Sequence, residues 1–442
     1  MADLLELSAR IIDSGVADEP VNRITNELSE LGDDLAIVES FSHSVVLRTG
    51  DGLVAFDASH SNTGVAVTDA IAAWATEPVT HLVYTHGHVD HVGGSRSFAA
   101  RWGEPVVLGH ENVDARFDRY EQTNDWNIQI NARQFGGIRQ DLGLGLENMD
   151  ERNAQWRHFV PEGTLRPTVA VGDEHRFTVG DEEIELHHAR GETDDHLWAW
   201  LPGRRTIMAG DFLIWNFPNA GNPQKVQRFP IEWAAAMRDM AAHEPELIVP
   251  AHGLPIAGTS RIVEVLETVA GTLDTLVEQV LQMMNEGARL DEIVHTVRVP
   301  DDVLARPYLR PFYDEPEFVV RNVWRQFGGW WDGAASRLKP APDGDVGTAI
   351  AELAGGTDRL IERARVEADN GNLRLACHLA DFAAWAAPDD PDVHRPRAEI
   401  YRRRRSSELS LMSKGIFAAA ARESEAVVAA DPSTDPSAEP TP

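Results

Sequence analysis

The chain has 442 residues and a formal net charge of -31 at pH 7, with 43% hydrophobic and 25% charged residues. The length allows two or three domains, and the composition is that of a soluble globular protein, which excludes a fibrous or largely disordered chain. Nucleic acids and anionic membranes attract basic surfaces, so the acidity argues against both as partners. The single cysteine, Cys377, excludes an intrachain disulfide framework.

The first residues carry acid where a secretory signal would carry Lys or Arg, and no long apolar stretch follows them. No segment of the sequence reaches the roughly 18 apolar residues of a membrane-spanning helix. We therefore expect a cytoplasmic protein that does not enter a membrane.

Short strands and helices alternate over the first 260 residues. An opening helix is followed by β-branched runs, and Gly50-Asp51-Gly52 marks a hairpin turn between two of them. We expect strands over 36–40, 44–48, 53–57, 82–84, 106–108, 184–188, 197–201, 206–209 and 247–249, and helices over 67–75, 97–102 and 231–243. This order is typical of an α/β fold in which two sheets are covered by helices.

The remainder of the chain has helical periodicity, with helices expected over 350–368, 373–385 and 393–403. The polar stretch 118–160 has little periodicity and predicts an irregular insertion beside an active site. The predicted domains are an N-terminal helical segment (1–30), a catalytic domain (31–260), an all-α helical domain (261–430) and a disordered tail (431–442).

One turn concentrates potential metal ligands. After the apolar run 81–84, the segment Thr85-His86-Gly87-His88-Val89-Asp90-His91 supplies three imidazoles and a carboxylate on two sides of a bend. Two such pairs can face two adjacent metal ions, and a bound metal lowers the pKa of its water to about 7. A mixed His/Asp set is compatible with Zn, but other divalent ions remain open.

Three more candidates lie at the ends of expected strands, where rigid backbone can fix a ligand. Glu192 follows the strand that ends at His188, Asp211 follows 206–209, and His252 follows 247–249. These positions complete a set of seven predicted ligands: His86, His88, Asp90, His91, Glu192, Asp211 and His252.

This arrangement resembles the metallo-β-lactamase superfamily, whose fold is a four-layer αβ/βα sandwich with a binuclear site. The resemblance implies that Asp57, at the end of an earlier strand, orients the ligands. Where most members have Gly-His-Thr, this chain has Gly191-Glu192-Thr193. That exchange resembles the alkyl sulfatases, which implies two Zn ions, Asp211 as the bridging ligand and a Glu ligand at position 192.

The second half also resembles the alkyl sulfatase dimerisation domain, through 307–313, 328–333 and 353–358. The resemblance implies a homodimer, and the tandem Trp330-Trp331 is consistent with one. Those enzymes usually end in a sterol-carrier-like domain, and we expect no such domain in this protein.

We therefore expect a binuclear zinc hydrolase that cleaves an alkyl or aryl-alkyl sulfate ester with a metal-activated water. The predicted catalytic residues are Asp90, Glu192 and His196, with His196 as a candidate acid for the leaving group. A transferred anion needs cations around it. The predicted substrate-binding residues are Asn219, Lys225, Arg228, Arg190 and Trp215, and Trp126, Phe135 and Phe217 are further candidates for an apolar wall.

Two other functions stay open from the sequence. The same fold and metals would serve hydrolysis of another ester-type bond, such as a phosphodiester, lactone, thioester or β-lactam. A non-catalytic dimeric scaffold that retains metal for stability is the second. Assays with each substrate class distinguish the three.

Overall fold

The computed structural model describes residues 3–135 and 158–430. It divides into two compact units, one with the described residues of 1–128 and 143–330, the other with those of 129–142 and 331–442. The predicted disordered tail at 431–442 and most of the predicted insertion lie outside the described residues.

The first unit contains two sheets. The strands of the seven-stranded sheet follow chain order: β1 (Leu28–Gly32), β2 (Leu35–Val38), β3 (Ser44–Thr49), β4 (Gly52–Phe56), β5 (Val79–Val83), β6 (Val106–His110) and β7 (Val169–Val171). Pairing is antiparallel from β1 to β4 and parallel from β4 to β7. The expected hairpin at Gly50–Gly52 joins β3 to β4.

The six-stranded sheet has the order β13-β12-β11-β10-β9-β8. Its strands are β8 (Glu174–Val179), β9 (Glu182–His188), β10 (Leu197–Leu201), β11 (Thr206–Gly210), β12 (Leu247–Pro250) and β13 (Ile256–Ala257). All pairs are antiparallel except β11 with β12.

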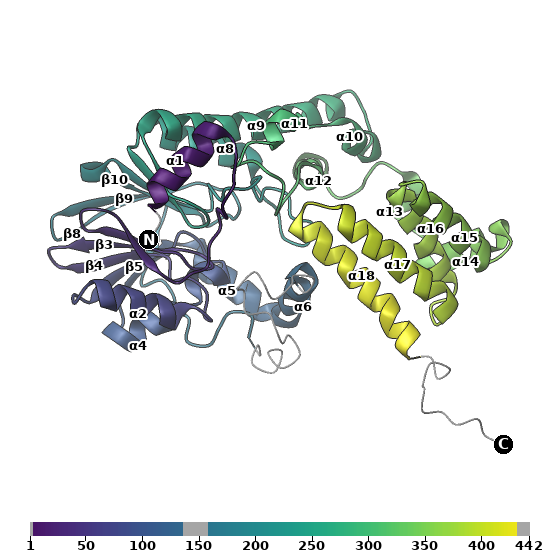
Figure 1. The fold of residues 1–442 in the computed structure, drawn as a ribbon, viewed down its shortest axis with the longest axis horizontal. Coiled ribbons are helices and arrows are strands. Elements are labelled where there is room, and N and C mark those ends of the chain that lie inside the picture. Colours follow the sequence, from purple (N-terminus) through teal and green to yellow (C-terminus); the bar gives the residue numbers. More distant parts are fainter. Residues whose placement is uncertain (1–2, 136–157, 431–442) are drawn as a thin grey trace, which may run out of the picture. The chain divides into compact units, whose positions relative to one another are not determined.

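Alternating side chains of β4 enter two different cores, as the period of a strand requires. Val54 and Phe56 belong to the core between the sheets, whereas Leu53 and Ala55 face the helices α2 (Gly64–Trp74) and α4 (Ser95–Trp102). On the far side of the second sheet lie α8 (Pro230–Ala242) and α9 (Thr259–Asn285), with α1 (Leu4–Ser14) beside them (Figure 1). The predicted four-layer αβ/βα sandwich is therefore confirmed.

Three more helices belong to the first unit by their contacts: α10 (Leu290–Thr296), α11 (Asp301–Leu304) and α12 (Pro316–Gly328). Val319, Val320 and Val323 of α12 are buried in the same core as the sheets. The residue boundary between the catalytic and helical domains stays a prediction, but α12 packs with the sandwich.

The second unit is helical and has a core of its own, which includes Leu360, Ala380 and Ile400. Its helices are α13 (Ala335–Leu338), α14 (Asp343–Ala354), α15 (Thr357–Asp369), α16 (Leu373–Ala386), α17 (Pro391–Ser407) and α18 (Leu411–Ala429). The single helix expected over 350–368 is two helices, because Gly355 and Gly356 both adopt positive φ.

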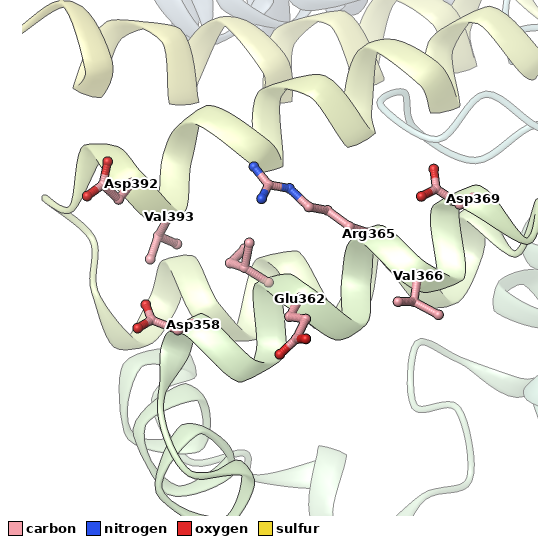
Figure 2. A pocket seen from close by; sticks show the side chains of 8 residues that line it. Asp358, Glu362, Arg365, Val366, Asp369, Asp392 and Val393 are labelled. Atoms are coloured by element: carbon pink, nitrogen blue, oxygen red, sulfur yellow. The ribbon is translucent and has the colours of Figure 1, made fainter.

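A pocket of about 420 Å³ lies between α15 and α17, and Figure 2 shows the side chains around it. None of the predicted site residues lines it. Its walls carry four carboxylates, one Arg and three aliphatic side chains: Asp358, Glu362, Asp369, Asp392, Arg365, Ile361, Val366 and Val393.

The polar stretch after 112 is more regular than its sequence indicates. It forms α5 (Asn112–Gln122) and α6 (Asn124–Phe135), so the expectation of an irregular insertion is wrong for residues 118–135. Residues 136–157 of that insertion lie outside the described part. Among the helices of 3–135 and 158–430, none has both the length and the apolar composition needed to cross a membrane.

Candidate metal centre

The turn after β5 carries four of the predicted ligands. β5 ends at Val83, and the chain turns through His86 and His88 before the short helix α3 (Val89–Val92) begins. His86 and His91 are fully buried, whereas His88 is half-buried. His86 and His88 therefore lie in the turn between β5 and α3, whereas Asp90 and His91 lie on α3 itself.

The structure brings all seven predicted ligands together. Three sets of side chains each place their ligand atoms within 4.8 Å of one another: His86, His88 and Glu192; His86, His91 and Asp211; Asp90, His91 and His252. Because His86 and His91 each belong to two sets, the three sets form one continuous cluster.

Asp211 lies at the centre of this cluster. Its Oδ2 is 3.4 Å from His91 Nε2 and 4.0 Å from His86 Nε2, and its Oδ1 is 3.5 Å from His252 Nε2. The carboxylate therefore faces ligands from both halves of the motif, the position that a bridging ligand would occupy.

The electrostatics of the cluster suit bound cations. Burial disfavours the ionised form of Glu192 and raises its pKa, whereas burial lowers the pKa of His86 well below its usual value. His91 Nε2 and Asp211 Oδ1 are buried with no hydrogen-bond partner among the described residues. Divalent metal ions bind neutral imidazoles and ionised carboxylates together, so this donor set fits them.

Asp57 supports the ligands from behind. Its Oδ2 lies 2.7 Å from His91 Nδ1, and its carboxylate accepts hydrogen bonds from the N–H and the hydroxyl of Thr85, each at 2.8 Å. Asp57 has a positive φ of 58°, a conformation that few non-glycine residues adopt. Its contact with His91 agrees with the orienting role that the resemblance implied.

A second support is a buried ion pair behind Gly87. Asp195 Oδ2 accepts from Gly87 N at 3.1 Å and from Arg116 Nε at 2.7 Å. A Cβ at position 87 would lie 2.9 Å from both Asp195 Oδ2 and Arg116 Cδ, so only glycine fits between the predicted ligands His86 and His88. This pair was not predicted, because Arg116 on α5 carries no local sequence motif that links it to the turn.

Glu192 is held by two of the residues predicted to bind substrate. Asn219 Nδ2 donates to Glu192 Oε1, and Arg228 Nη1 lies 3.0 Å from the same oxygen while also donating to the backbone carbonyl of Glu192. Arg228 is 1% exposed. Both residues therefore lie at the cluster, as expected, but their contacts in this structure are with a predicted ligand.

His196 lies beside the cluster, stacked on Phe212 with ring centroids 4.1 Å apart, and its centroid is 4.5 Å from that of His86. Asp211 N donates to His196 Nε2 at 3.2 Å. Burial lowers the pKa of His196 to about 3, so its ring is neutral with Nε2 as an acceptor. These contacts suit a residue that positions Asp211 better than a proton donor.

Two further polar side chains interact electrostatically with carboxylates of the cluster. Lys225 is subject to the charges of Asp90 and Glu192, and burial lowers its pKa to about 8. Burial and the charges of the same two carboxylates raise the pKa of Tyr313 well above its usual value, so its hydroxyl keeps its proton. Lys225 is one of the predicted substrate-binding residues, whereas Tyr313 lies in the 307–313 stretch and was not predicted as a site residue.

Two predicted substrate-binding residues make other contacts. Arg190 is half exposed, forms an ion pair with Glu232 at 3.2 Å and stacks over Phe229. Trp215 is 1% exposed and donates from Nε1 to the carbonyl of Leu254.

The other residues predicted to line an apolar wall lie in two different places. Phe217 is fully buried in the core, and Trp126 and Phe135 lie on α6. A wall role for Trp126, Phe135 and Phe217 stays a prediction.

Comparison with known proteins agrees with this geometry. Residues 37–252 match the family model of the metallo-beta-lactamase superfamily, and residues 289–426 match that of alkyl sulfatase dimerisation. A linear primary-alkylsulfatase from Pseudomonas sp. is 24% identical over 402 residues, which cover 87% of this chain and 74% of the relative. An (R)-specific secondary-alkylsulfatase from Pseudomonas sp. is 24% identical over 336 residues, 73% of this chain and 50% of the relative.

Among solved structures, the stereoselective inverting sec-alkylsulfatase Pisa1 from Pseudomonas sp. superposes with a TM-score of 0.77 at 21% identity, over 90% of this chain and 66% of that chain. This likeness shows a shared fold. The chain spans about half to three quarters of the length of these relatives.

Fold and ligand cluster together define a metallo-β-lactamase-type domain followed by helices. With both family models matched in order, the chain belongs to the metallo-beta-lactamase superfamily, in the branch that carries the alkyl sulfatase dimerisation domain.

Proposed function

We propose that the protein is a metal-dependent hydrolase that cleaves sulfate esters. The observation that carries this proposal is the seven-ligand cluster in which Glu192 takes part and is held by Asn219 and Arg228. The relatives named as alkylsulfatases support the same reaction class.

The proposed cofactor is a pair of Zn ions. His86, His88 and Glu192 would hold one, Asp90, His91 and His252 would hold the other, and Asp211 lies between the two sets. When bound, such ions supply Lewis acidity and lower the pKa of a water molecule to near neutrality, where it can act as a nucleophile.

The sulfate group would be bound by cations and donors of the loop 219–228. Lys225, with a pKa of about 8, is positively charged at neutral pH. Arg228 Nε and Asn222 Nδ2 are buried donors without a hydrogen-bond partner among the described residues. Donors fixed in a water-poor site stabilise developing negative charge more strongly than water does.

Tyr313 is our candidate for the acid that protonates the departing alcohol. It retains its proton at all relevant pH values, and it lies within electrostatic reach of Glu192, Asp90 and Asp211. His196 is less suited, because its Nε2 already accepts a hydrogen bond from the backbone of Asp211.

The organic part of the substrate would be apolar. Lys225 Nζ lies 5.6 Å from the centre of the Phe159 ring, and Phe159 packs with Tyr120 and Val89 in a small apolar cluster. Val89 immediately precedes the predicted ligand Asp90. A cation beside an apolar cluster suits an anionic head carried on an alkyl or aryl-alkyl group.

Sulfate release from the full-length, zinc-loaded protein tests the proposal. Alkyl sulfates of several chain lengths would be compared with p-nitrophenyl phosphodiesters, lactones, thioesters and nitrocefin, with His252→Ala as the inactive reference. Sulfate release that disappears in the variant supports sulfate ester hydrolysis. No release at any chain length, together with turnover of a diester, lactone, thioester or β-lactam, would overturn it.

We also propose a homodimer, which the match to the alkyl sulfatase dimerisation model over 289–426 supports. Light scattering at micromolar concentration is expected to give twice the mass of one chain. A mass of one chain would contradict it.

A further inference from the structure

The loop 219–228 connects the second sheet to α8 and carries the two side chains that hold Glu192. An irregular loop has no ladder of its own to fix it, so its backbone groups need partners elsewhere. Those partners come from residues 314–322, which lie well beyond the last predicted ligand in the sequence.

Asp314 binds the middle of the loop. Its carboxyl group is fully buried and accepts hydrogen bonds from Gly221 N at 2.6 Å and Asn222 N at 3.2 Å, as well as from Glu315 N at 2.8 Å. This single side chain thus fixes two successive peptide groups of the loop.

Asn322, on α12, binds the loop at two places. Its Nδ2 donates to the carbonyl of Ala220 at 3.0 Å and to that of Arg228 at 2.9 Å, and its Oδ1 accepts from Arg228 N at 3.3 Å. Asn322 is buried, so each of these groups would lose a partner without replacement by water. Asn322 therefore binds both the backbone N–H and the backbone carbonyl of Arg228.

The loop and the start of α12 also touch directly. A Cβ at Gly221 would lie 2.5 Å from the carbonyl carbon of Phe318 and from Val319 N, so only glycine permits this approach. Asp314, Gly221 and Asn322 together hold Asn219 and Arg228 at the two ends of one pinned segment.

We infer that Asp314 and Asn322 are positioning residues for the proposed metal centre, acting on Glu192 through Asn219 and Arg228. Both lie in the segment that matches the alkyl sulfatase dimerisation model, so part of that segment would build the catalytic unit in addition to any role in dimerisation. The inference rests on the proposed metal site. If the loop 219–228 is freed from Asp314 or Asn322, we expect the ion held by Glu192 to be lost more readily.

The test uses the full-length protein loaded with zinc and two independent variants. Asn322→Asp keeps the size of the side chain but places a carboxylate oxygen opposite two carbonyl groups. Asp314→Asn replaces one carboxyl oxygen with an NH2 group, so one acceptor for the three backbone N–H groups is lost. The control is Arg321→Ala on the same helix, because the Arg321 side chain is half exposed and contacts Glu317.

Three quantities are measured: hydrogen exchange of a peptide spanning 219–228, the rate of zinc loss to an excess of chelator, and kcat and KM for the best substrate. We expect faster exchange in 219–228, zinc loss faster by about 10- to 100-fold and a fall in kcat larger than the change in KM in both variants. The control should match the wild type in all three.

Faster exchange with zinc loss at the wild-type rate would overturn the inference, because the loop would then be loosened without effect on Glu192. Equal zinc loss in the control would overturn it as well. If Asn322→Asp does not fold, Asp314→Asn decides by the same measurements. Zinc loss needs no substrate, so it separates this inference from failure of the sulfate ester assignment.

Discussion

Arg228 Nη1 contacts two groups of Glu192, because it lies 3.0 Å from the carboxylate Oε1 and also donates to the backbone carbonyl. Both side chains are buried. The carboxylate that replaces the usual imidazole of the superfamily thus has its own buried counter-charge. Single and double substitutions of Arg228 and Glu192 can therefore measure how strongly the two residues depend on each other.

Glu192→His, which introduces the imidazole of other family members, should destabilise the metal-free protein by about 3–5 kcal/mol, because it leaves the Arg228 guanidinium buried without its partner. The double variant Glu192→His with Arg228→Met should recover most of that loss. Urea unfolding in chelator measures it. Arg190→Met, an exposed arginine paired with Glu232, is the control and should change little. A double variant as unstable as the single one would contradict the pairing.

Asp195→Asn should weaken metal retention by about 10- to 100-fold, because Asp195 accepts from the backbone between His86 and His88 and from Arg116. Asp194→Asn is a close control, since Asp194 also binds Arg116 but its side chain is 46% exposed. Competition with a chromogenic zinc chelator compares the two. Equal metal loss in both variants would show that Arg116, and not the contact with Gly87, is what matters.

Metal removal should lower the thermal midpoint strongly, because ligands that bind only the folded state stabilise it by mass action. Elemental analysis of protein dialysed against zinc should give two ions per chain. His88→Ala should retain one ion, whereas His295→Ala, an exposed histidine on α10, should retain both. A single ion per chain in the wild type would contradict the two-ion proposal.

The seven side chains of the cluster could be grouped from the sequence because each follows a strand, and parallel or adjacent strands bring their ends together. Asp211 and His252 illustrate this, since β11 and β12 are paired in parallel. No such rule relates Arg116 or Asn322 to the site. Their roles depend on which helix packs beside which loop, and a single sequence carries no local signal for that.

The same limit explains the incorrect or unsupported expectations. Trp215 and Phe217 follow a predicted ligand in the sequence, yet both are buried in the large core of the first unit. The helices α5 and α6 were missed because their composition is mostly polar, and helical periodicity is weak where few apolar residues mark a face.

Asp314 should make stability depend on pH. Burial raises its pKa to about 7 from the usual 3.8, against three backbone N–H donors and the nearby Arg228 charge, which lower it. Between pH 4 and 7 the folded state therefore binds a proton here that the unfolded chain releases. As the pH rises through that window, this group alone should lower the free energy of unfolding by about 1.4 kcal/mol per pH unit.

Asp314→Asn cannot titrate, so its destabilisation relative to the wild type should be larger at pH 5.5 than at pH 8, where the wild-type carboxyl is itself ionised and costly to bury. Urea unfolding of metal-free protein at the two pH values measures this difference, with Arg321→Ala as the pH-independent control. An equal destabilisation at both pH values would mean that Asp314 is ionised throughout, because its three N–H donors outweigh burial.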